Sequence, residues 1–583
     1  MANFAPTPTS LPPANVLIRL KELPGSLPNY HPLACPHSRV LHDPLIVNPL
    51  AFILRAAQIY PDKVALVHTD VPNPVVYTFS VWAQRIQNLA YALINAGIKP
   101  GDRVGPCYTP TRPLDAHHGV LAARAVLTPI NTRLNSSEVA YIIEHSQCKL
   151  LLVDQEYLHL VAGTRVPIVV SNDTGRAGDP YEDFLAAGRR FSAEKGWPGL
   201  DSEPNENAGA VLCYTSGTTG RDPTSLQSPM PLKDRSFLCF MRLVGHFPGQ
   251  MCSPLLSRSV AKSLMREPIQ TFPANLKVTL RTVNYTQIWN HFLHSGVTHY
   301  CAAPTIGIVN HPQAKKPPQP ISAIIAGAAP TAHLIAELEK TGIKPIHVYG
   351  LTQAQQTYGP FTRNYEHPSW AHLPLEQRAR LMAHQGHAFA TAEEVRVVCT
   401  PESPDEDVNG PLRDVPRDGK TVGEVITRGN IVMKEYFRDP EATRKAFAGG
   451  SFHSGDLAVW HPDGAIAIMD RSKDIIISGG ENASSLAIEQ ELSSHPHVLE
   501  VSVVARKHPK WGERPMAFVV LHPQHAATWE GQSKHFEKDL KEHAKTRLPG
   551  FACPEWVEVV PELPKTSTGK IMKAELRKRV AKL

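Results

Sequence analysis

The sequence of 583 residues lacks several features that define other classes of protein. Its nine cysteines include no Cys-x-x-Cys pair, which argues against a zinc site or a disulfide scaffold and favours a reducing compartment. No apolar run approaches the roughly 18 residues of a membrane-spanning helix, so we expect no transmembrane segment. The net charge of +6 is small for this length and gives no reason to expect a nucleic-acid partner. The length and an ordinary hydrophobic content of 42% predict a globular protein of two or more domains.

The phosphate-binding P-loop motif is also missing, because Gly419-Lys420-Thr421 has Asp414 where that motif requires its first glycine. A different glycine- and hydroxyl-rich turn is present, Thr215-Ser216-Gly217-Thr218-Thr219-Gly220, after an apolar strand predicted over 208–213. Hydroxyls and glycine amides can donate to phosphate oxygens without steric hindrance, so this turn predicts an anion-binding loop. A polar hairpin turn is the alternative.

Strand and helix patterns alternate along the first half of the chain. Apolar residues recur at helical spacing over 81–96 and stop at Gly97, and strands are predicted over 64–67, 75–77 and 150–153. This alternation predicts an α/β domain with largely parallel sheets. Residues 1–45 are rich in proline without periodicity and predict an irregular N-terminal arm.

The second half of the chain carries five further motifs in which a predicted strand or turn presents small, polar or charged residues. They are Ala326-Gly327-Ala328-Ala329-Pro330, His347-Val348-Tyr349-Gly350-Leu351-Thr352, His453-Ser454-Gly455-Asp456, Asp470-Arg471-Ser472-Lys473-Asp474 with Ile475–Asn482, and Pro564-Lys565-Thr566-Ser567-Thr568-Gly569-Lys570-Ile571. Taken singly, each has a plain alternative, such as a helix-entry turn, a charged surface turn or a basic tail. Within the fourth motif, Ile475–Ile477 predicts a buried strand.

In this order the motifs resemble those of the adenylate-forming, AMP-binding superfamily, which includes acyl-CoA synthetases, coumarate-CoA ligases, luciferases and peptide-synthetase adenylation domains. The resemblance runs from about residue 50 to the end. It implies an α/β fold with a large N-terminal AMP-binding domain over 46–470, made of stacked α/β subdomains and a β-rich subdomain. A small, mobile α+β lid domain over 471–583 would carry the catalytic lysine.

The resemblance also implies roles for individual residues. Residues expected to bind ATP or AMP are Thr215, Ser216, Gly217, Thr218, Thr219 and Gly220 at the phosphates, Gly327, Ala328, Ala329 and Tyr349 near adenine, Gly350 and Leu351 next to Tyr349, Asp456 at the ribose, Arg471 at the ribose or phosphate, and Thr352 and Lys570 at the α-phosphate. Thr352 and Lys570 would be catalytic, Lys473 would be the hinge, and Ser478, Gly479 and Gly480 would contact CoA.

The implied activity is that of an ATP-dependent acid–CoA ligase, with ATP, Mg²⁺ and CoA as cofactors or co-substrates and a small carboxylic acid as substrate. Joining the acid to AMP brings two anions together, which requires positive charge from Lys570 and Mg²⁺. Rotation of the lid about Lys473 would then admit the CoA thiol. The acid is left open between fatty, aryl and specialised-metabolite acids. Luciferase-like oxidation is an alternative, and a peptide synthetase is not expected because no carrier domain follows Lys570.

Two departures from the family pattern bear on activity. Residues 221–283, where a proline-lysine-glycine and the acyl-pocket segment are expected, carry no readable resemblance. We favour a frameshifted or misspliced reading over a rebuilt pocket. Gln353 stands where the family has a magnesium-binding glutamate. Its amide oxygen can coordinate the ion but lacks the negative charge of a carboxylate. A catalytically impaired nucleotide- or acyl-binding relative is therefore the second hypothesis.

The tripeptide Ala581-Lys582-Leu583 looks like a variant of the Ser-Lys-Leu peroxisomal address. It predicts a peroxisomal location and the import receptor as a partner. A chance basic terminus on a cytoplasmic protein is the alternative.

Overall fold

The computed structural model describes residues 50–68, 72–107, 114–132, 134–195, 200, 208–214, 237–240, 255–258, 276–280, 283–302, 304, 308–351, 360–389, 392–400, 412–429, 432–471, 474–565 and 571–582. The chain forms two compact units, the first of residues 1–301, 354–359 and 430–443, and the second of 302–353, 360–429 and 444–583. None of the helices in the described part is both long and apolar enough to cross a membrane.

The first unit contains a seven-stranded sheet with the order β18-β8-β7-β4-β3-β5-β6. Its strands are β3 (Arg103–Cys107), β4 (Val126–Leu127), β5 (Cys148–Asp154), β6 (Ile168–Ser171), β7 (Gly209–Cys213), β8 (Phe237–Phe240) and β18 (Glu435–Tyr436). Strands β6, β5, β3, β4 and β7 are parallel, whereas β8 and β18 pair antiparallel. The parallel part agrees with the strand–helix alternation of the sequence.

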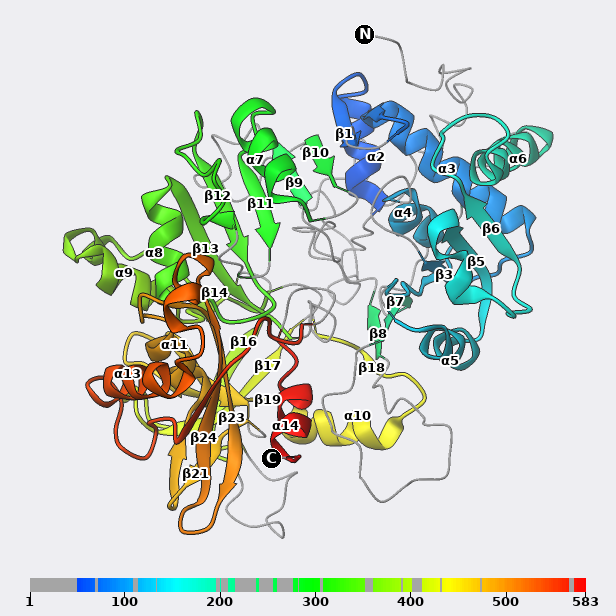
Figure 1. The fold of residues 1–583 in the computed structure, drawn as a ribbon. Helices are drawn as coiled ribbons and strands as arrows, with labels where there is room; N and C mark the ends of the chain where they lie inside the picture. The colour runs from blue at the N-terminus through cyan, green and yellow to red at the C-terminus, as the bar shows by residue number, and fades with distance from the viewer. Residues whose placement is uncertain are drawn as a thin grey trace. The chain divides into compact units, whose positions relative to one another are not determined.

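The helices of the first unit lie beside its strands (Figure 1). They are α2 (Leu50–Ile59), α3 (Phe79–Asn95), α4 (Leu114–Ala122), α5 (Ser136–Ser146), the 3-10 helix η1 (Gln155–Val161), α6 (Pro180–Glu194) and α7 (Tyr285–His294). Helix α3 begins where the Thr78 side chain accepts the Val81 amide and ends before Gly97, whose φ of +85° favours glycine. A Cβ at Gly188 of α6 would lie 2.1 Å from the Asn88 carbonyl oxygen, so the glycine permits close packing of α6 on α3.

A further series of paired strands in the first unit has the order β11-β9-β10-β1-β2, which is one end of a longer strand order. Its strands are β1 (Val64–His68), β2 (Val75–Thr78), β9 (Leu255–Arg258), β10 (Leu276–Thr279) and β11 (His299–Ala302). Strands β8, β9 and β10 fall within 221–283, a segment in which the sequence shows no sustained alternating pattern. Three stretches of this segment nevertheless pair with strands outside it: β8 with β7, β9 with β11 and β10 with β1.

The second unit contains the parallel strands β12 (Ile321–Ile325) and β13 (Ile343–Tyr349), with β14 (Thr362–Arg363) and β15 (His387–Ala388) antiparallel beyond them. The helices of this part are α8 (Ala332–Lys340), the 3-10 helix η3 (Pro368–His372) and α9 (Leu375–Met382). An antiparallel sheet follows in the order β16 (Glu394–Val398), β17 (Val422–Arg428), β19 (Phe452–Trp460) and β20 (Ile466–Arg471). Helix α10 (Pro440–Ala446), which begins in the first unit and ends in the second, and the 3-10 helix η4 (Ala448–Gly450) precede β19.

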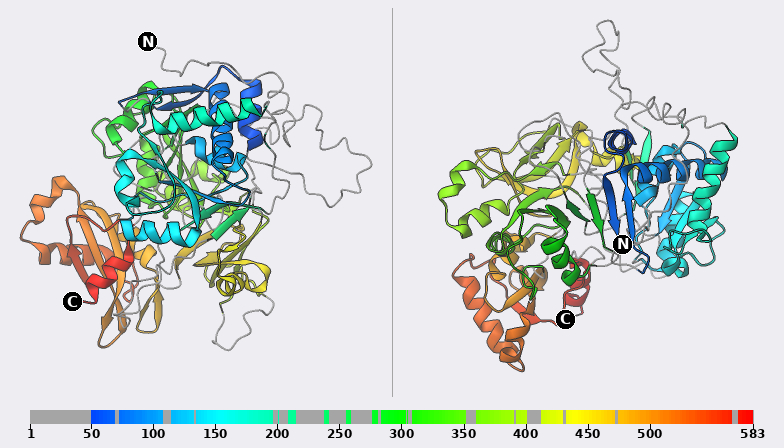
Figure 2. Two further views of the ribbon diagram at one scale, coloured as in Figure 1. Left: turned by 90° about the vertical axis from the view of Figure 1, so that its right-hand side faces the viewer. Right: turned by 90° about the horizontal axis from the view of Figure 1, so that it is seen from above.

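The last part of the second unit is a sheet covered by helices, as Figures 1 and 2 show in orange and red. The strands are β21 (Ile476–Ser478), β22 (Glu481–Ala483), β23 (Val498–His508), β24 (Gly512–Leu521) and β25 (Trp556–Val559). The helices are α11 (Ser485–Leu492), α12 (Pro523–Ala526), η5 (Ala527–Trp529), α13 (Ser533–Lys545) and α14 (Lys573–Val580). Ile488, Phe536 and Leu540 pack with Val503 and Val519 in one core.

The strand Ile475–Ile477 was expected to be buried throughout, but Ile477 is 55% exposed, because alternate residues of β21 face opposite sides and only Ile476 and Ser478 point inward. The predicted domain boundary at 470/471 does not coincide with the division into the two units and stays a prediction.

Candidate active site

Three residues predicted to bind the nucleotide come together in the second unit. Tyr349 ends β13, Asp456 lies in β19, and Arg471 ends β20, where Asp456 and Arg471 are partners across the strand pair. The Tyr349 hydroxyl donates to Oδ2 of Asp456, and Nε of Arg471 lies 3.4 Å from Oδ1 of the same carboxylate. The ring of Phe361 packs edge-on against Tyr349 with centroids 4.7 Å apart. The carboxylate is thus held between one hydroxyl and one guanidinium.

Burial and charge fix the protonation of this group. The pKa of Tyr349 lies well above its usual value of 10.0, because the phenol is buried and the negative charge of Asp456 opposes its ionisation. Tyr349 therefore remains a neutral donor. Asp456 is 5% exposed, and a buried carboxylate requires such partners. Its oxygens suit the two hydroxyls of a ribose, which donate to carboxylates.

The predicted adenine-binding turn over 326–330 follows the carboxyl end of β12, and Tyr349 lies at the carboxyl end of the neighbouring strand β13. Strands β12 and β13 are parallel, with Ile325 opposite His347, so the turn after β12 and the residues after β13 leave the sheet at one end. Gly327 has a φ of +89° and is exposed, as is Ala328, whereas Ala329 is half-buried. Carboxyl ends of parallel strands are common positions for ligands. The role of this turn in binding adenine stays a prediction.

Glu424 of β17, for which the sequence predicts no role, contacts the turn before Asp456. Its Oε1 accepts the Gly455 amide at 2.8 Å, and its Oε2 lies 2.8 Å from Nδ1 of His453. The Ser454 hydroxyl accepts the Asp456 amide at 3.0 Å. Glu424 is 29 residues from His453, so only the pairing of β17 with β19 reveals the contact.

Asp470, just before the predicted hinge, is tied to the start of α11. Its Oδ2 accepts from both the amide and the hydroxyl of Ser485 at 2.6 Å, and its Oδ1 accepts the Arg471 amide at 2.8 Å. Two basic residues of α14 lie nearby: Lys573 is 2.8 Å from Glu489, and Arg577 pairs with Asp474. Asp470 thus links the strand that carries Arg471 to the first turn of α11.

The residues predicted to contact CoA divide into buried and exposed positions. Ser478 is buried, and its hydroxyl accepts from Nη1 of Arg514 at 3.0 Å. Gly479 and Gly480 are exposed with φ of +64° and +90°, and a Cβ on Gly479 would lie 3.0 Å from the Trp511 ring. The two glycines thus form an open turn next to an indole.

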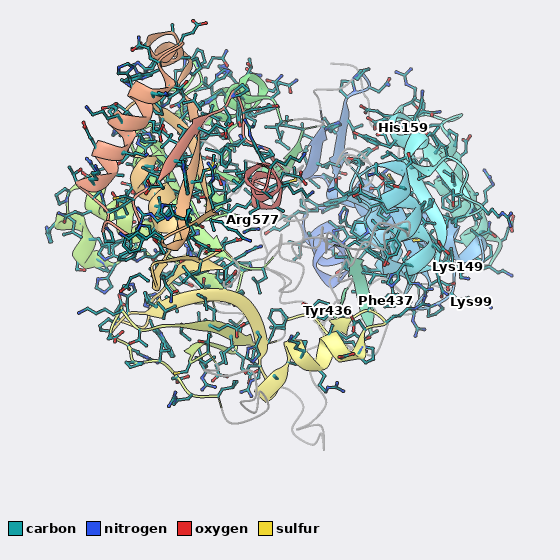
Figure 3. The ribbon with its side chains drawn as sticks, turned by 60° about the horizontal axis from the view of Figure 1, so that its bottom comes forward. Lys99, Lys149, His159, Tyr436, Phe437 and Arg577 are labelled. Carbon is teal, nitrogen blue, oxygen red and sulfur yellow. The ribbon has the colours of Figure 1, made fainter. Side chains whose placement is uncertain are left out.

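Several predicted site residues lie outside the described residues, so their roles stay predictions. They are Thr215, Ser216, Gly217, Thr218, Thr219, Gly220, Thr352, Gln353, Lys473 and Lys570. The residue before the phosphate loop is described: the Tyr214 hydroxyl lies 2.8 Å from Nδ1 of His145. The rings of His145 and Phe437 form a T-shaped contact with centroids 5.8 Å apart, and Figure 3 labels Phe437 next to Tyr436. Gly350 is half-buried and Leu351 buried.

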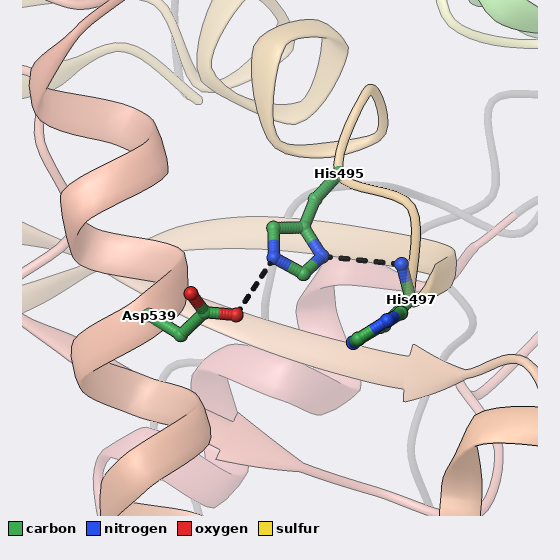
Figure 4. A group of neighbouring side chains, drawn as sticks. All are labelled: His495, His497 and Asp539. Carbon is green, nitrogen blue, oxygen red and sulfur yellow. Dashed lines mark hydrogen bonds and ion pairs between the residues drawn. The ribbon is translucent and has the colours of Figure 1, made fainter.

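One group of described residues has the composition of a metal site, namely His495, His497 and Asp539 (Figure 4). The directions of its hydrogen bonds oppose that function. The His497 amide donates to Nδ1 of His495 at 3.2 Å, and Trp529 donates to Nδ1 of His497 at 2.9 Å. A metal-bound imidazole normally donates its second N–H, whereas here both Nδ1 atoms accept. We therefore interpret the group as a tether, in which Nε2 of His495 donates to Asp539 at 3.0 Å.

The fold is shared with solved structures of adenylate-forming enzymes. The anthranilate CoA ligase AuaEII in complex with anthranoyl-AMP matches with a TM-score of 0.70 and 21% identity over 93% of this chain and 99% of that one. ATP-bound MatB from Rhodopseudomonas palustris matches with a TM-score of 0.68 and 20% identity over 91% and 99%. The fold class expected from the sequence is confirmed.

Sequence comparisons identify the family. The model "AMP-binding enzyme" matches residues 53–222, and "AMP-binding enzyme C-terminal domain" matches 487–570. The peroxisomal acetate/butyrate–CoA ligase of Arabidopsis thaliana is 35% identical over 92% of this chain and 95% of that protein. An acetate–CoA ligase of Humulus lupulus is 36% identical with the same coverage, and the peroxisomal trans-cinnamate:CoA ligase of Petunia hybrida is 32% identical over 96% of each. The chain belongs to the AMP-binding enzyme family, which confirms the resemblance seen in its motifs.

Proposed function

We propose that this protein is an AMP-forming acid–CoA ligase, which activates a carboxylic acid with ATP and transfers the acyl group to CoA. The observation that carries the proposal is the convergence of Tyr349 and Arg471 on the buried carboxylate of Asp456. The names of the matched relatives, which are acetate–, butyrate– and cinnamate–CoA ligases, support the same activity.

In the first half-reaction, a carboxylate oxygen of the acid attacks the α-phosphorus of ATP. The bond from that phosphorus to the bridging oxygen of pyrophosphate breaks, and pyrophosphate leaves with the electron pair. Asp456 would hold the ribose hydroxyls, with Arg471 beside them, while Lys570 would offset the charge where the two anions meet. Thr352 would contact the α-phosphate, and the loop Thr215–Gly220 would hold the departing pyrophosphate.

In the second half-reaction, the CoA thiolate attacks the carbonyl carbon of the acyl-adenylate, and AMP leaves with its phosphate oxygen. Rotation of the lid about Lys473 would remove Lys570 and admit CoA past Gly479 and Gly480. Separating the two steps in this way prevents the thiol and ATP from competing for one position.

Mg²⁺ is expected to enter as its ATP complex, because phosphate oxygens are strong ligands for a hard cation. Gln353 would add one neutral oxygen where a carboxylate would bind more strongly. The side chain of Gln353 therefore fits the ion only weakly. The roles given to Asp456, Arg471 and Lys570 do not depend on a protein ligand to the metal.

The test is pyrophosphate release from the full chain with ATP and a panel of acids that includes acetate, butyrate, benzoate and cinnamate. We expect release with at least one acid, and loss of it in Asp456→Ala and Lys570→Ala. Replacing the exposed His535 by Gln serves as the matched control. Absence of release with every acid, in protein that is folded, would contradict the proposal.

A second candidate function is that of a nucleotide- or acyl-binding relative without ligase activity. Two observations favour it: Gln353 replaces the expected carboxylate, and the match to the first family model ends at residue 222, where the atypical segment 221–283 begins. AMP binding without pyrophosphate release would support this function. Sequencing the transcript across the codons for 210–290 and 350–360 separates a faulty reading of an active ligase from a changed protein.

We also propose a peroxisomal location with the import receptor as partner. Several relatives are named as peroxisomal, and Ala581-Lys582-Leu583 resembles the address that the receptor reads. A fluorescent protein fused before the chain should enter peroxisomes. The same fusion without Leu583 should remain in the cytosol, and equal distribution of the two would contradict the proposal.

A further inference from the structure

The turn that presents Asp456 is an irregularity in the pairing of β17 with β19. Glu424 pairs with Leu457 and Ile426 pairs with His453, so residues 454–456 form a bulge opposite one residue of β17. Gly455, in the middle of the bulge, has a φ of +72°, a conformation that glycine adopts at low cost. A bulge disrupts the ladder locally and leaves amides without a strand partner. The Gly455 amide finds its acceptor in Oε1 of Glu424 at 2.8 Å.

The second oxygen of Glu424 determines the charge of His453. Nδ1 of His453 lies 2.8 Å from Oε2 of Glu424, and its Nε2 lies 3.1 Å from the Ala448 carbonyl oxygen. A carbonyl oxygen and an ionised carboxylate accept hydrogen bonds and cannot donate them, so with Glu424 ionised each ring nitrogen must carry a proton. An imidazole with two N–H groups is a cation. The side chains of His453 and Glu424 are 21% and 19% exposed, so water screens this pair only partly.

We infer that Glu424 and protonated His453 are a positioning pair that fixes the Gly455–Asp456 turn for the nucleotide. The inference rests on the proposed function, because it takes Asp456 as the ribose-binding group. Glu424 acts through the Gly455 amide and does not contact the Asp456 carboxylate in any described interaction. His453 acts on Glu424 by neutralising it and by orienting its two oxygens.

The charge of His453 makes the positioning depend on pH. The hydrogen bond to Glu424 raises the pKa of His453 above its ordinary value of 6.5, against the opposing effect of burial. Glu424 on β17 is the charged group that faces the ring in the described structure, and η4 contributes the Ala448 carbonyl. As the pH rises through the raised pKa, His453 loses one proton and one of its two hydrogen bonds. The turn then loosens, and affinity for the nucleotide falls.

Binding of AMP to the full chain, measured by calorimetry between about pH 7 and 9, tests the inference, because the AMP phosphate stays doubly charged in that range. We expect the wild-type affinity to fall as the pH rises. His453→Gln should bind more weakly at pH 7 and lose the pH dependence, whereas the exposed-site control His535→Gln should keep the wild-type profile. Glu424→Ala should weaken binding by about tenfold at pH 7. Glu424→Gln keeps an oxygen for the Gly455 amide and should shift the loss of affinity to lower pH.

Hydrogen exchange in the absence of nucleotide gives a readout that does not depend on the proposed function. The peptide that contains Gly455 should exchange faster in Glu424→Ala than in wild type, and Glu424→Gln should lie between them at pH 7. If wild type binds no AMP at any pH, the nucleotide-binding function fails. The exchange measurement then still tests whether Glu424 and His453 position the Gly455–Asp456 turn. Unchanged exchange in Glu424→Ala, or an AMP affinity of wild type that does not vary with pH, would overturn the inference.

Discussion

The hydroxyl of Tyr349, at the end of β13, donates to the carboxylate of Asp456, which lies 107 residues further along the chain in β19. Two structural layers thereby meet at one buried charge, because β13 belongs to the parallel strands and β19 to the antiparallel sheet of the second unit. The contact gives Asp456 a partner before any ligand arrives. It also fixes the Tyr349 ring against Phe361.

Replacing Tyr349 by Phe should remove this hydrogen bond while keeping the ring. We expect the free energy of unfolding to fall by about 1–3 kcal/mol, because the buried Asp456 carboxylate loses a donor. AMP affinity should fall as well, since the carboxylate is then less well oriented. Thermal unfolding and calorimetric AMP binding measure the two effects. Tyr365→Phe is the matched control, because Tyr365 is 42% exposed, and equal effects of the two variants would contradict the assigned role.

The motifs around Tyr349, Asp456 and Arg471 could be predicted because each is a short local pattern in a fixed order. The contacts of Glu424 could not, because nothing near Glu424 in the sequence indicates that its partners are His453 and Gly455 across a bulged strand pair. Strand periodicity alone would have corrected the expectation for Ile477, which alternates with two inward residues of β21.

Arg85 of α3 forms a buried network with acidic residues of two other helices. Its Nε lies 2.9 Å from Asp115 of α4, and Nη1 lies 2.7 Å from Glu182 of α6. Arg85→Ala leaves the fully buried Asp115 without its cation, so we expect a loss of about 3–5 kcal/mol in the free energy of unfolding. Denaturant unfolding measures the loss. The exposed Arg176→Ala should change stability by less than about 0.5 kcal/mol, and a similar small change in Arg85→Ala would refute the network's importance.

Gly188 and Gly119 offer a comparison between two kinds of close contact. A Cβ at Gly188 would meet backbone atoms, the Asn88 carbonyl oxygen at 2.1 Å and the Ala92 nitrogen at 2.5 Å. A Cβ at Gly119 would instead meet only side-chain atoms of Leu89, the nearest at 2.7 Å, and a side chain can shift more readily than backbone. Overpacking typically lowers the free energy of unfolding by about 1–3 kcal/mol. We therefore expect Gly188→Ala to lower it by about 3 kcal/mol or more, and Gly119→Ala to lower it by less. Thermal unfolding of both variants checks the order, and the reverse order would show that α3 and α6 can separate freely.

The histidines near α13 should make this part of the protein sensitive to acid. Nδ1 of His495 accepts from a backbone amide, and Nδ1 of His543 lies 3.3 Å from Nη1 of Arg547, so protonation of either ring would break a hydrogen bond. Burial lowers the pKa of both His495 and His543 below the ordinary value of 6.5, with attraction to Asp539 as an opposing effect. At these two histidines the unfolded chain then binds more protons than the folded one below about pH 6.5, so their contribution to stability is full above that pH and falls as the pH decreases.

Thermal unfolding between about pH 5 and 8 checks this dependence. Wild type should lose stability progressively below about pH 6.5. His495→Gln, which does not titrate, should lose less over the same range than wild type does. The exposed His535→Gln should follow wild type. An acid profile of His495→Gln identical to wild type would show that His495 does not titrate with unfolding.

Added Zn²⁺ should leave the unfolding temperature unchanged at each pH, because both Nδ1 acceptors in the group of His495, His497 and Asp539 oppose metal binding. Stabilisation by Zn²⁺ that disappears in Asp539→Asn would instead identify that group as a metal site.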